Sequence, residues 1–355
     1  MGVRREDAWS YCVIGCNELG IPGRCADAAC ATAGTVQYLG LLNATLEQPD
    51  LARVTGMPEL LSAIEQMMAV RVSRMREWGA GYRARVAAEA PTPFTSALMH
   101  GCVELGRDML TGMQYRFSGV YERGLTNAAN ALAAIDELVF HRHELSLPQL
   151  VGNMEANWAD TDLLSRVRAA PKWGNDDDAD RWALELVRMR ERVLDEVDRA
   201  SGTPPHVVCH VVRSLHHVDG KRLSASADGR RSGEPLADSI GAQAGTARCG
   251  PTAVVRSVLK LNASGDYKGG YNLNLTLPLG TGEDSIQALL ETFFASGGQE
   301  LQVACLDPDL LRAARRFPEL HGDLLVRVAG FTARFVDLSR AEQDELMSRA
   351  DAVAR

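Results

Sequence analysis

The sequence lacks both a long hydrophobic run and an excess of positive charge. No apolar stretch is long enough to span a bilayer, and residues 1–7 do not have the sustained apolar core of a signal peptide. Lys and Arg number 38 against 46 Asp and Glu, and the net charge of −8 argues against nucleic acid and anionic membranes as partners. We therefore expect a cytoplasmic protein that binds neither.

Cysteine is present, but not in the arrangement of a small secreted domain held by disulfides. The chain has eight cysteines in 355 residues, enough length to bury one large core or two ordinary ones. This combination favours reduced thiols in a reducing interior. Internal repeats and low-complexity segments are also absent from the sequence, and a content of 46% hydrophobic and 24% charged residues is typical of a soluble globular protein.

The spacing of apolar residues predicts a mainly helical region over residues 24–200, followed by a mixture of strands and helices. The clearest predicted helices are at residues 60–78, 128–140 and 309–316, with a further helix after residue 283 and a closing helix. The predicted strands are at residues 206–212, 271–277 and 300–305. No firm domain boundary is visible in the composition.

One glycine is the most informative residue of the chain. Gly330 lies within residues 327–335, which are otherwise β-branched, aromatic and strand-like. Glycine weakens a strand, because it loses the most backbone entropy and has no side chain to pack. One explanation is a bulge or a close approach of backbone. The other is chemical: loss of one of its two Cα hydrogens gives a planar radical that is delocalised over both flanking amides.

This segment resembles the radical loop of the glycyl radical enzymes, the family of pyruvate formate-lyase, in which the matching glycine stores the radical. Other segments are similar to the family in the same order along the chain: residues 91–98, 115–120, 171–178, 228–238, 250–253, 299–303, 307–314 and 338–345. The resemblance covers nearly the whole chain. It implies that Gly330 carries a radical installed after translation by a radical-SAM activating enzyme, with no metal or organic cofactor in this chain.

The same resemblance identifies a thiol partner near the other end of the chain. Gly15, Cys16 and Glu18 form a Gly-Cys-x-Glu segment similar to the family's cysteine loop at the tip of a hairpin. It implies that the Gly330 radical takes the hydrogen of the Cys16 thiol, and that the thiyl radical then takes a hydrogen atom from the substrate. In an extended segment Glu18 would point to the same side as Cys16, where it could act as the general acid or base.

The resemblance also implies a fold, and it implies that this chain forms only part of that fold. We expect an α/β fold that forms half of a ten-stranded barrel, with helices outside and both radical loops inside. The first domain would be the C-terminal part of the barrel over residues 1–225, and the second the glycine radical domain over residues 226–355. The match begins just before the cysteine hairpin, so the first half-barrel would be missing. A truncated gene model, a split enzyme and a shortened homologue are three explanations, and we expect a complementary N-terminal half-barrel chain or a homo-oligomer.

The residues on either side of Cys16 restrict the type of reaction that is expected. Acyl transfer of the formate C-acetyltransferase type uses two adjacent cysteines, whereas Cys16 follows Gly15 and precedes Asn17. The Gly-Cys-x-Glu pattern is similar to the branch of dehydratases, choline lyase, sulfonate lyases and arylacetate decarboxylases. We therefore expect cleavage of a C–O, C–N, C–S or C–C bond in a small organic substrate. Acyl transfer and a non-catalytic, radical-bearing partner subunit are the alternatives.

Metal sites are the competing interpretation of several clusters. Four cysteines have the spacing C-x3-C-x8-C-x4-C, which matches no common zinc or iron–sulfur pattern: Cys12, Cys16, Cys25 and Cys30. The acidic residues 176–178 could bind a divalent cation, but they more often cap the following helix. Four histidines could bind a metal but are expected at the surface or in a pocket: His206, His210, His216 and His217.

Overall fold

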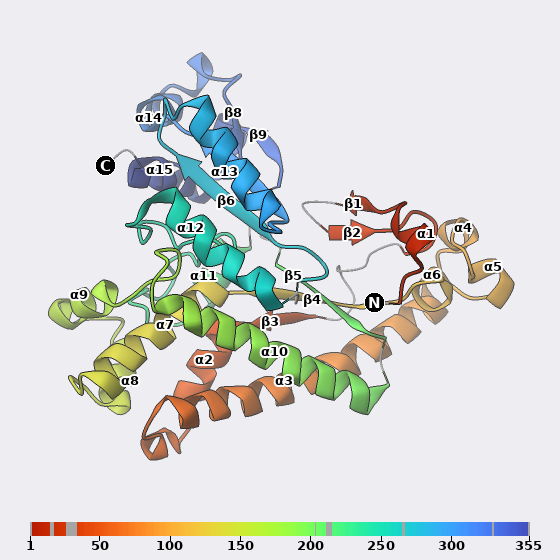
Figure 1. Ribbon diagram of the computed structural model, residues 1–355, viewed down its shortest axis with the longest axis horizontal. Helices are drawn as coiled ribbons and strands as arrows, with labels where there is room; N and C mark the ends of the chain where they lie inside the picture. Colours follow the sequence, from red (N-terminus) through yellow and green to blue (C-terminus); the bar gives the residue numbers. More distant parts are fainter. Residues whose placement is uncertain are drawn as a thin grey trace.

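Five parallel strands form the centre of the fold. The computed structural model describes residues 2–14, 18–25, 34–202, 204–210, 215–264, 267–328 and 330–353. The strands are β3 (Thr35–Gln37), β4 (Ser118–Arg123), β5 (His206–Cys209), β6 (Asn272–Leu277) and β7 (Glu300–Cys305). Strands β3, β4 and β5 pair in this order, and β6 pairs with β7. A parallel bridge between His210 and Tyr271 joins the two sets, and Figure 1 labels β3, β4, β5 and β6.

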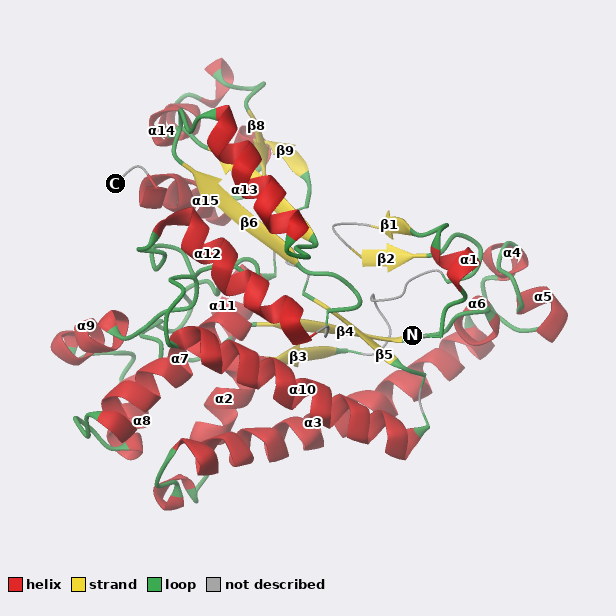
Figure 2. Ribbon diagram, in the orientation of Figure 1, coloured by secondary structure: helices red, strands yellow, loops and turns green. Residues whose placement is uncertain are grey.

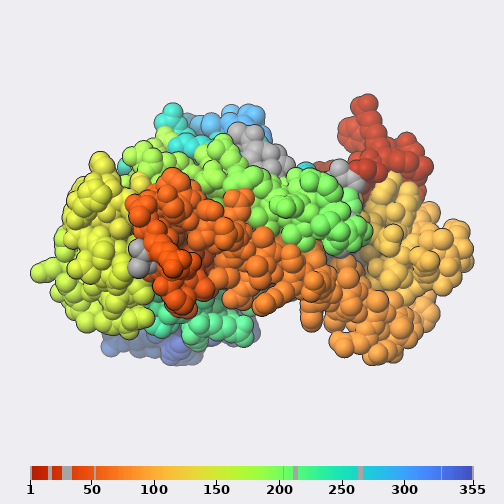
Figure 3. Space-filling model, turned by 90° about the horizontal axis from the view of Figure 1, so that it is seen from below, coloured from red at the N-terminus to blue at the C-terminus, as the bar shows by residue number. Residues whose placement is uncertain are grey.

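Long helices cover one side of β3, β4 and β5, as Figure 2 shows. The main ones are α2 (Tyr38–Leu46), α3 (Met57–Glu89), α7 (Leu125–Ile135) and α10 (Ala179–Ser201). Seen from below, α3 and α10 form a large part of the outer surface of the molecule (Figure 3). Each connection between parallel strands therefore includes helices, as expected for an α/β fold in which the strands are buried.

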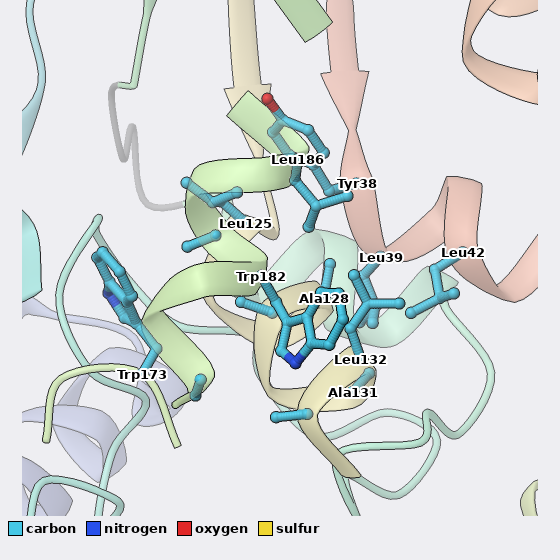
Figure 4. Packing of buried hydrophobic residues seen from close by; sticks show 14 of the residues in the cluster. Tyr38, Leu39, Leu42, Leu125, Ala128, Ala131, Leu132, Trp173, Trp182 and Leu186 are labelled. Atoms are coloured by element: carbon cyan, nitrogen blue, oxygen red, sulfur yellow. The ribbon is translucent and has the colours of Figure 1, made fainter. Parts of the chain in front are cut away.

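The amphipathic pattern of α10 explains how it is fixed to the core. Trp182, Leu186, Met189 and Val193 recur every three or four residues and are buried. Helix α7 has no exposed face, because every one of its residues is buried. Its alanines allow neighbouring elements to approach closely, and Figure 4 shows α7 side chains among those of α2 and α10.

A buried ion pair lies inside this core. The Glu122 carboxylate on β4 pairs with the Arg190 guanidinium of α10. It also accepts hydrogen bonds from the Tyr38 and Tyr267 hydroxyls and contacts Nδ1 of His210 at 3.1 Å. Burial alone would raise the pKa of Glu122, but Arg190, His210 and Tyr267 lower it to about 2. The charge is therefore retained in the core by a complete set of partners.

In the described part of the chain, two antiparallel hairpins are not paired with the parallel strands. The first pairs β1 (Cys12–Ile14) with β2 (Glu18–Gly20), and the second pairs β8 (Leu325–Arg327) with β9 (Thr332–Arg334). The remaining helices near the second hairpin are α13 (Glu283–Ala295), α14 (Pro308–Arg316) and α15 (Arg340–Val353). Among the described residues, no helix combines the length and apolar character needed to cross a membrane.

Shorter helices complete the fold around these elements. They are α1 (Arg5–Ala8), α4 (Pro93–Ala97), α5 (Cys102–Leu105), α6 (Met109–Gly112), α8 (Leu147–Glu155), α9 (Thr161–Ala169), α11 (His216–Arg222) and α12 (Gly250–Leu259). The predicted helices and strands are present, although residues 211–214 lie outside the described residues. The region expected to be mainly helical also contains the two short strands β3 and β4.

Candidate active site

Gly330 lies at the turn of the β8–β9 hairpin. Arg327 and Thr332 are the last paired residues of the two strands, and the Val328 amide donates to the Phe331 carbonyl at 3.0 Å. The φ angle of Gly330 is +75°, in the left-handed region that other residues rarely adopt. The turn is therefore by itself a sufficient conformational reason for glycine, and the expected strand is a hairpin with glycine at its tip.

Gln302 fixes this turn to the parallel strands. Its Oε1 atom accepts a hydrogen bond from the Gly330 amide at 3.1 Å and another from Nε of Arg327 at 3.1 Å. Gln302 lies on β7 and is 8% exposed. A single buried amide oxygen thus holds the backbone of the candidate radical residue and the end of β8 together.

Glu300 lies two residues before Gln302 on β7, so both side chains are on the same face of the strand. Its Oε2 atom is buried and has no hydrogen-bond partner among the described residues. Burial raises the pKa of Glu300 to about 7, and the positive charge of Arg327 opposes this rise only in part. A carboxyl group that exchanges its proton near neutral pH is therefore placed beside the glycine hairpin.

The glycine hairpin has its own small hydrophobic core, which is separate from the main one. Its buried members are Leu311, Ala314, Val326, Val328, Phe335, Leu346 and Ala350. They come from α14, α15 and the hairpin with the residues that follow it. Arg349 of α15 also donates from Nη1 to the Val328 carbonyl at 3.4 Å. The helix that follows the hairpin therefore helps to hold it in place.

Glu18 begins the second strand of the other hairpin. It is 6% exposed, and the Tyr121 hydroxyl of β4 lies 3.5 Å from its Oε1 atom. The carboxylate is thus directed to the parallel strands and away from solvent. Cys16, the predicted thiol, lies outside the described residues, as do its neighbours Gly15 and Asn17. The pairing of β1 with β2 agrees with the expected cysteine hairpin.

The competing metal interpretations have different outcomes. Among the described residues, Cys12 and Cys25 form no disulfide, while Cys16 and Cys30 are outside the described residues, so the four-cysteine metal site, which the spacing disfavours, is not tested. In the acidic run, Asp177 accepts from the Ala179 amide at 2.9 Å at the start of α10, whereas the N-cap residue itself, Asp178, makes no side-chain capping hydrogen bond. Its neighbour Asp176 pairs with Lys260.

The expectation of surface or pocket histidines is wrong for three of the four, because His206, His210 and His216 are buried. His206 is buried, with Nδ1 at 2.8 Å from Asp198 and Nε2 at 3.0 Å from Glu191. Burial alone would lower the pKa of His206, but the two carboxylates raise it to about 9. His210 is buried beside Glu122. These histidines therefore stabilise the core. His216 and His217 both contact Glu345 of α15.

Sequence reasoning missed Gln302 and Glu300. The segment around them matched the family pattern, but no role was assigned to either residue. The available signal is the alternation of polar and apolar residues in β7, which is typical of a strand with one polar face. That alternation places Glu300 and Gln302 together, but it does not reveal that they face a turn 28 residues further along the chain.

Comparison with protein families and curated proteins gives consistent matches over this chain. Residues 1–214 match the family described as pyruvate formate lyase-like, and residues 236–336 match the glycine radical family. (2S)-3-sulfopropanediol dehydratase of Klebsiella oxytoca is 28% identical over 99% of this chain and 45% of its own length. Isethionate sulfite-lyase of Bilophila wadsworthia is 27% identical, over 98% and 45%. The chain spans about half the length of these curated relatives.

Comparison with solved structures confirms the fold prediction. The B12-independent glycerol dehydratase from Clostridium butyricum, in its glycerol-bound form, has a TM-score of 0.89 and 26% identity. The match covers 98% of this chain but 46% of that one. The five parallel strands with helices on their outer side thus correspond to part of the larger α/β structure. The division between residues 225 and 226 stays a prediction.

Proposed function

Because the chain belongs to the glycyl radical enzyme family, we propose that it forms the C-terminal part of a glycyl radical lyase or dehydratase. Gly330 stores the radical, Cys16 carries it to the substrate, and Glu18 moves a proton. The observation that carries this proposal is the hydrogen bond from the Gly330 amide to the buried Gln302. It holds the backbone of the radical residue at a fixed place beside the strands.

The proposed reaction begins outside this chain. A radical-SAM activating enzyme removes one hydrogen atom from the Gly330 Cα and leaves a carbon radical there. The glycyl radical then takes the hydrogen atom of the Cys16 thiol, which restores the glycine Cα–H bond and leaves a thiyl radical. The thiyl radical removes a hydrogen atom from a substrate carbon. Each transfer moves one hydrogen atom and one unpaired electron, so no external oxidant or reductant enters after activation.

Glu18 supplies the proton movement that bond cleavage requires. Its low exposure shields the carboxyl group from bulk water, which strengthens its interaction with a substrate hydroxyl or leaving group. Once the substrate radical has formed, Glu18 accepts the proton of a neighbouring hydroxyl while the C–O or C–S bond breaks. The product radical then takes the hydrogen atom back from Cys16, which becomes a thiyl radical again. In the reverse of the first transfer, this thiyl radical takes a hydrogen atom from the Gly330 Cα, so the thiol is restored and the glycyl radical is regenerated.

The substrate class follows from the relatives only at a coarse level. Two of them are a (2S)-3-sulfopropanediol dehydratase and an isethionate sulfite-lyase. Sulfopropanediol and isethionate are both small polar molecules. We propose a small polar substrate of this kind, with C–O or C–S cleavage ahead of C–C and C–N cleavage.

The exposed apolar side chains near the cysteine hairpin support the proposal that other protein covers it. Trp9, Tyr11 and Val13 are 76%, 61% and 58% exposed, and several large apolar residues with this exposure in one short segment are typical of an interaction surface. We propose that an N-terminal half-barrel covers them, with a second copy of the chain as the alternative. A monomer of the chain that melts cooperatively and binds no N-terminal half-barrel would contradict this part of the proposal.

A second function is favoured by one observation. The separate core of the glycine hairpin would allow this region to act as a radical-bearing module on another protein, without catalysis by Cys16. One variant distinguishes the two functions. Cys16→Ala abolishes turnover but keeps the radical if the chain is catalytic, whereas it leaves both unchanged if the chain only carries the radical.

The experiment that tests the main proposal is anaerobic EPR spectroscopy. The chain is incubated with a radical-SAM activating enzyme and an N-terminal half-barrel, and the wild type is compared with Gly330→Ala. We expect a doublet in the wild type, from coupling to the single remaining Cα hydrogen, and no signal in the variant. Gly322→Ala is the matched control, because its Cβ would be 4.0 Å from the nearest atom. An equal signal in the Gly330 variant would overturn the assignment.

A further inference from the structure

Two adjacent histidines and a glutamate converge where the C-terminal helix meets the rest of the chain. His216 and His217 are the first two residues of α11, and Glu345 is on α15. The Nε2 atoms lie 2.6 Å (His216) and 2.5 Å (His217) from the same oxygen, Oε2 of Glu345. We propose that these three residues form a binding site for a divalent transition-metal ion, for which Zn²⁺ fits the donor set best.

The donor atoms have the identity and closeness that such an ion requires. Each residue offers one ligand atom, and the three atoms lie within 4.8 Å of one another. Two imidazole nitrogens and a carboxylate oxygen are common ligands of Zn²⁺. With Zn–N and Zn–O distances of about 2.0–2.2 Å, a tetrahedral ion would require the ligand atoms to separate by less than ~1 Å. Small side-chain rotations are sufficient for this change.

The hydrogen bonding of the cluster is incomplete without an ion. The three side chains are 6%, 11% and 11% exposed. Two buried ring nitrogens, Nδ1 of His216 and Nε2 of His217, have no hydrogen-bond partner among the described residues. The His217 Nε2 atom lies 2.5 Å from the same Glu345 oxygen that His216 approaches. Buried polar atoms in proteins are nearly always satisfied, and two imidazole nitrogens that converge on one carboxylate oxygen favour a ligand shared by all three side chains.

The charges around the cluster also favour a cation. Arg349 pairs with Glu345 and with Asp238, and the amide of Asn274 donates to Asp238 at 2.9 Å. With neutral imidazoles, two carboxylates face one guanidinium and leave one negative charge in excess. Arg349 approaches Glu345 at Oε1, whereas the histidines approach Oε2. The Oε2 side is therefore available to a second cation.

A second group of potential metal ligands differs from this site in the pairing of its histidine. Glu191, Asp195 and His206 also bring three donor atoms within reach of one another. Both ring nitrogens of His206 are, however, already paired with carboxylates. That imidazole is held protonated and offers no lone pair to a metal. The cluster on α11 and α15 differs because its two histidines share one carboxylate oxygen.

Metal binding here would connect two regions of the chain. Arg349 is one turn beyond Glu345 on α15 and donates to the carbonyl of Val328, two residues before Gly330. An ion held by α11 and α15 would therefore clamp the helix that supports the glycine hairpin. Since a ligand that binds the folded state alone stabilises it, Zn²⁺ should raise the melting temperature of the full chain.

The test is a metal titration of the full chain after treatment with a chelator. Thiols also bind zinc, so the stoichiometry is compared between the wild type, His217→Ala, Glu345→Gln and the control His141→Ala. His141 pairs with Glu137 at the surface without a second histidine. We expect the wild type and the His141 variant to bind one equivalent of Zn²⁺ more than the other two. Equal stoichiometry in all four proteins would overturn the proposal.

A second measurement does not depend on the folding of the variants. X-ray absorption at the zinc edge, on wild-type protein loaded with one equivalent, reports the ligands directly. The proposal predicts nitrogen and oxygen ligands only, at about 2.0–2.2 Å. A shell of sulfur ligands at about 2.3 Å would show that the tightest site is formed by cysteines, and would contradict the proposed site.

Discussion

The two hairpins of this chain are embedded very differently. The glycine hairpin contributes Val326 to a small core that also buries Phe335, and two helices cover it. In the cysteine hairpin, by contrast, Val13 and Ile14 are exposed, while Glu18 is buried against the parallel strands. The chain therefore builds the surroundings of its candidate radical-storage residue by itself, but it leaves one side of the candidate thiol hairpin open.

The largest expected effect tests this difference in packing directly. Phe335→Ala removes a fully buried ring from the small core and should reduce the free energy of unfolding by about 3–5 kcal/mol. Val13→Ala, in the exposed cysteine hairpin, should change it by less than ~0.5 kcal/mol. Denaturant unfolding of both variants checks the comparison. Similar losses for the two would show that the cysteine hairpin is covered in the isolated chain.

The next effect concerns the main core and its response to pH. His206 has its pKa raised from 6.5 to about 9, so its stabilising contribution is complete below pH 6.5 and is lost as the pH rises through 9. We expect His206→Gln to cost about 2 kcal/mol at pH 6 and much less at pH 10. Thermal melts across this range measure the difference. A cost that does not change with pH would contradict the paired, protonated histidine.

Gln302→Leu should affect the glycine hairpin more than the rest of the molecule. It removes the acceptor of the Gly330 amide and of Arg327, at a cost of about 1–2 kcal/mol. Gln302→Glu, which keeps an acceptor at this position, is the matched control. Hydrogen exchange of the Gly330 amide should accelerate in the leucine variant and stay slow in the glutamate variant. Equal protection in both would contradict the proposed anchoring of the turn.

The smallest expected effect is the removal of a buried carboxyl group. The pKa of Glu300 is raised from 4.5 to about 7, so the folded state loses stability as the pH rises from 4.5 through 7. Since Glu300 is only half-buried, water screens this cost to about 1 kcal/mol. Glu300→Gln should therefore raise the melting temperature at pH 8 and leave it nearly unchanged at pH 4.5. An increase at both values would point to packing.

The sequence alone predicts the helices and strands that have a clear local pattern of polar and apolar residues. The apolar periodicity of residues 60–78 predicts part of α3, and the alternation in residues 271–277 predicts β6. The strands β3 and β4 were not predicted, because a short buried strand has no distinctive alternation. Their positions depend on pairing between distant segments, such as Thr35 with Tyr121.

The sequence predicts the chemistry of the candidate site, but it does not predict the residues that hold the site in place. The flanking motifs identified Gly330 as a radical candidate, although its left-handed conformation is a separate reason for glycine. The contact with Gln302 and the burial of Glu300 arise from tertiary packing between β7 and the hairpin. The carboxylate partners of His206 come from one face of α10, which periodicity alone does not connect to a histidine on β5.

The most direct test of the account is to find where oxygen breaks the activated chain. Protein that shows the radical signal is exposed to air, and its fragments are identified by mass spectrometry. A radical stored on Gly330 should yield cleavage at that residue and release a short C-terminal fragment that begins at Phe331. A chain that stays intact after it has carried the radical signal, or that is cleaved elsewhere, would contradict storage of the radical on Gly330.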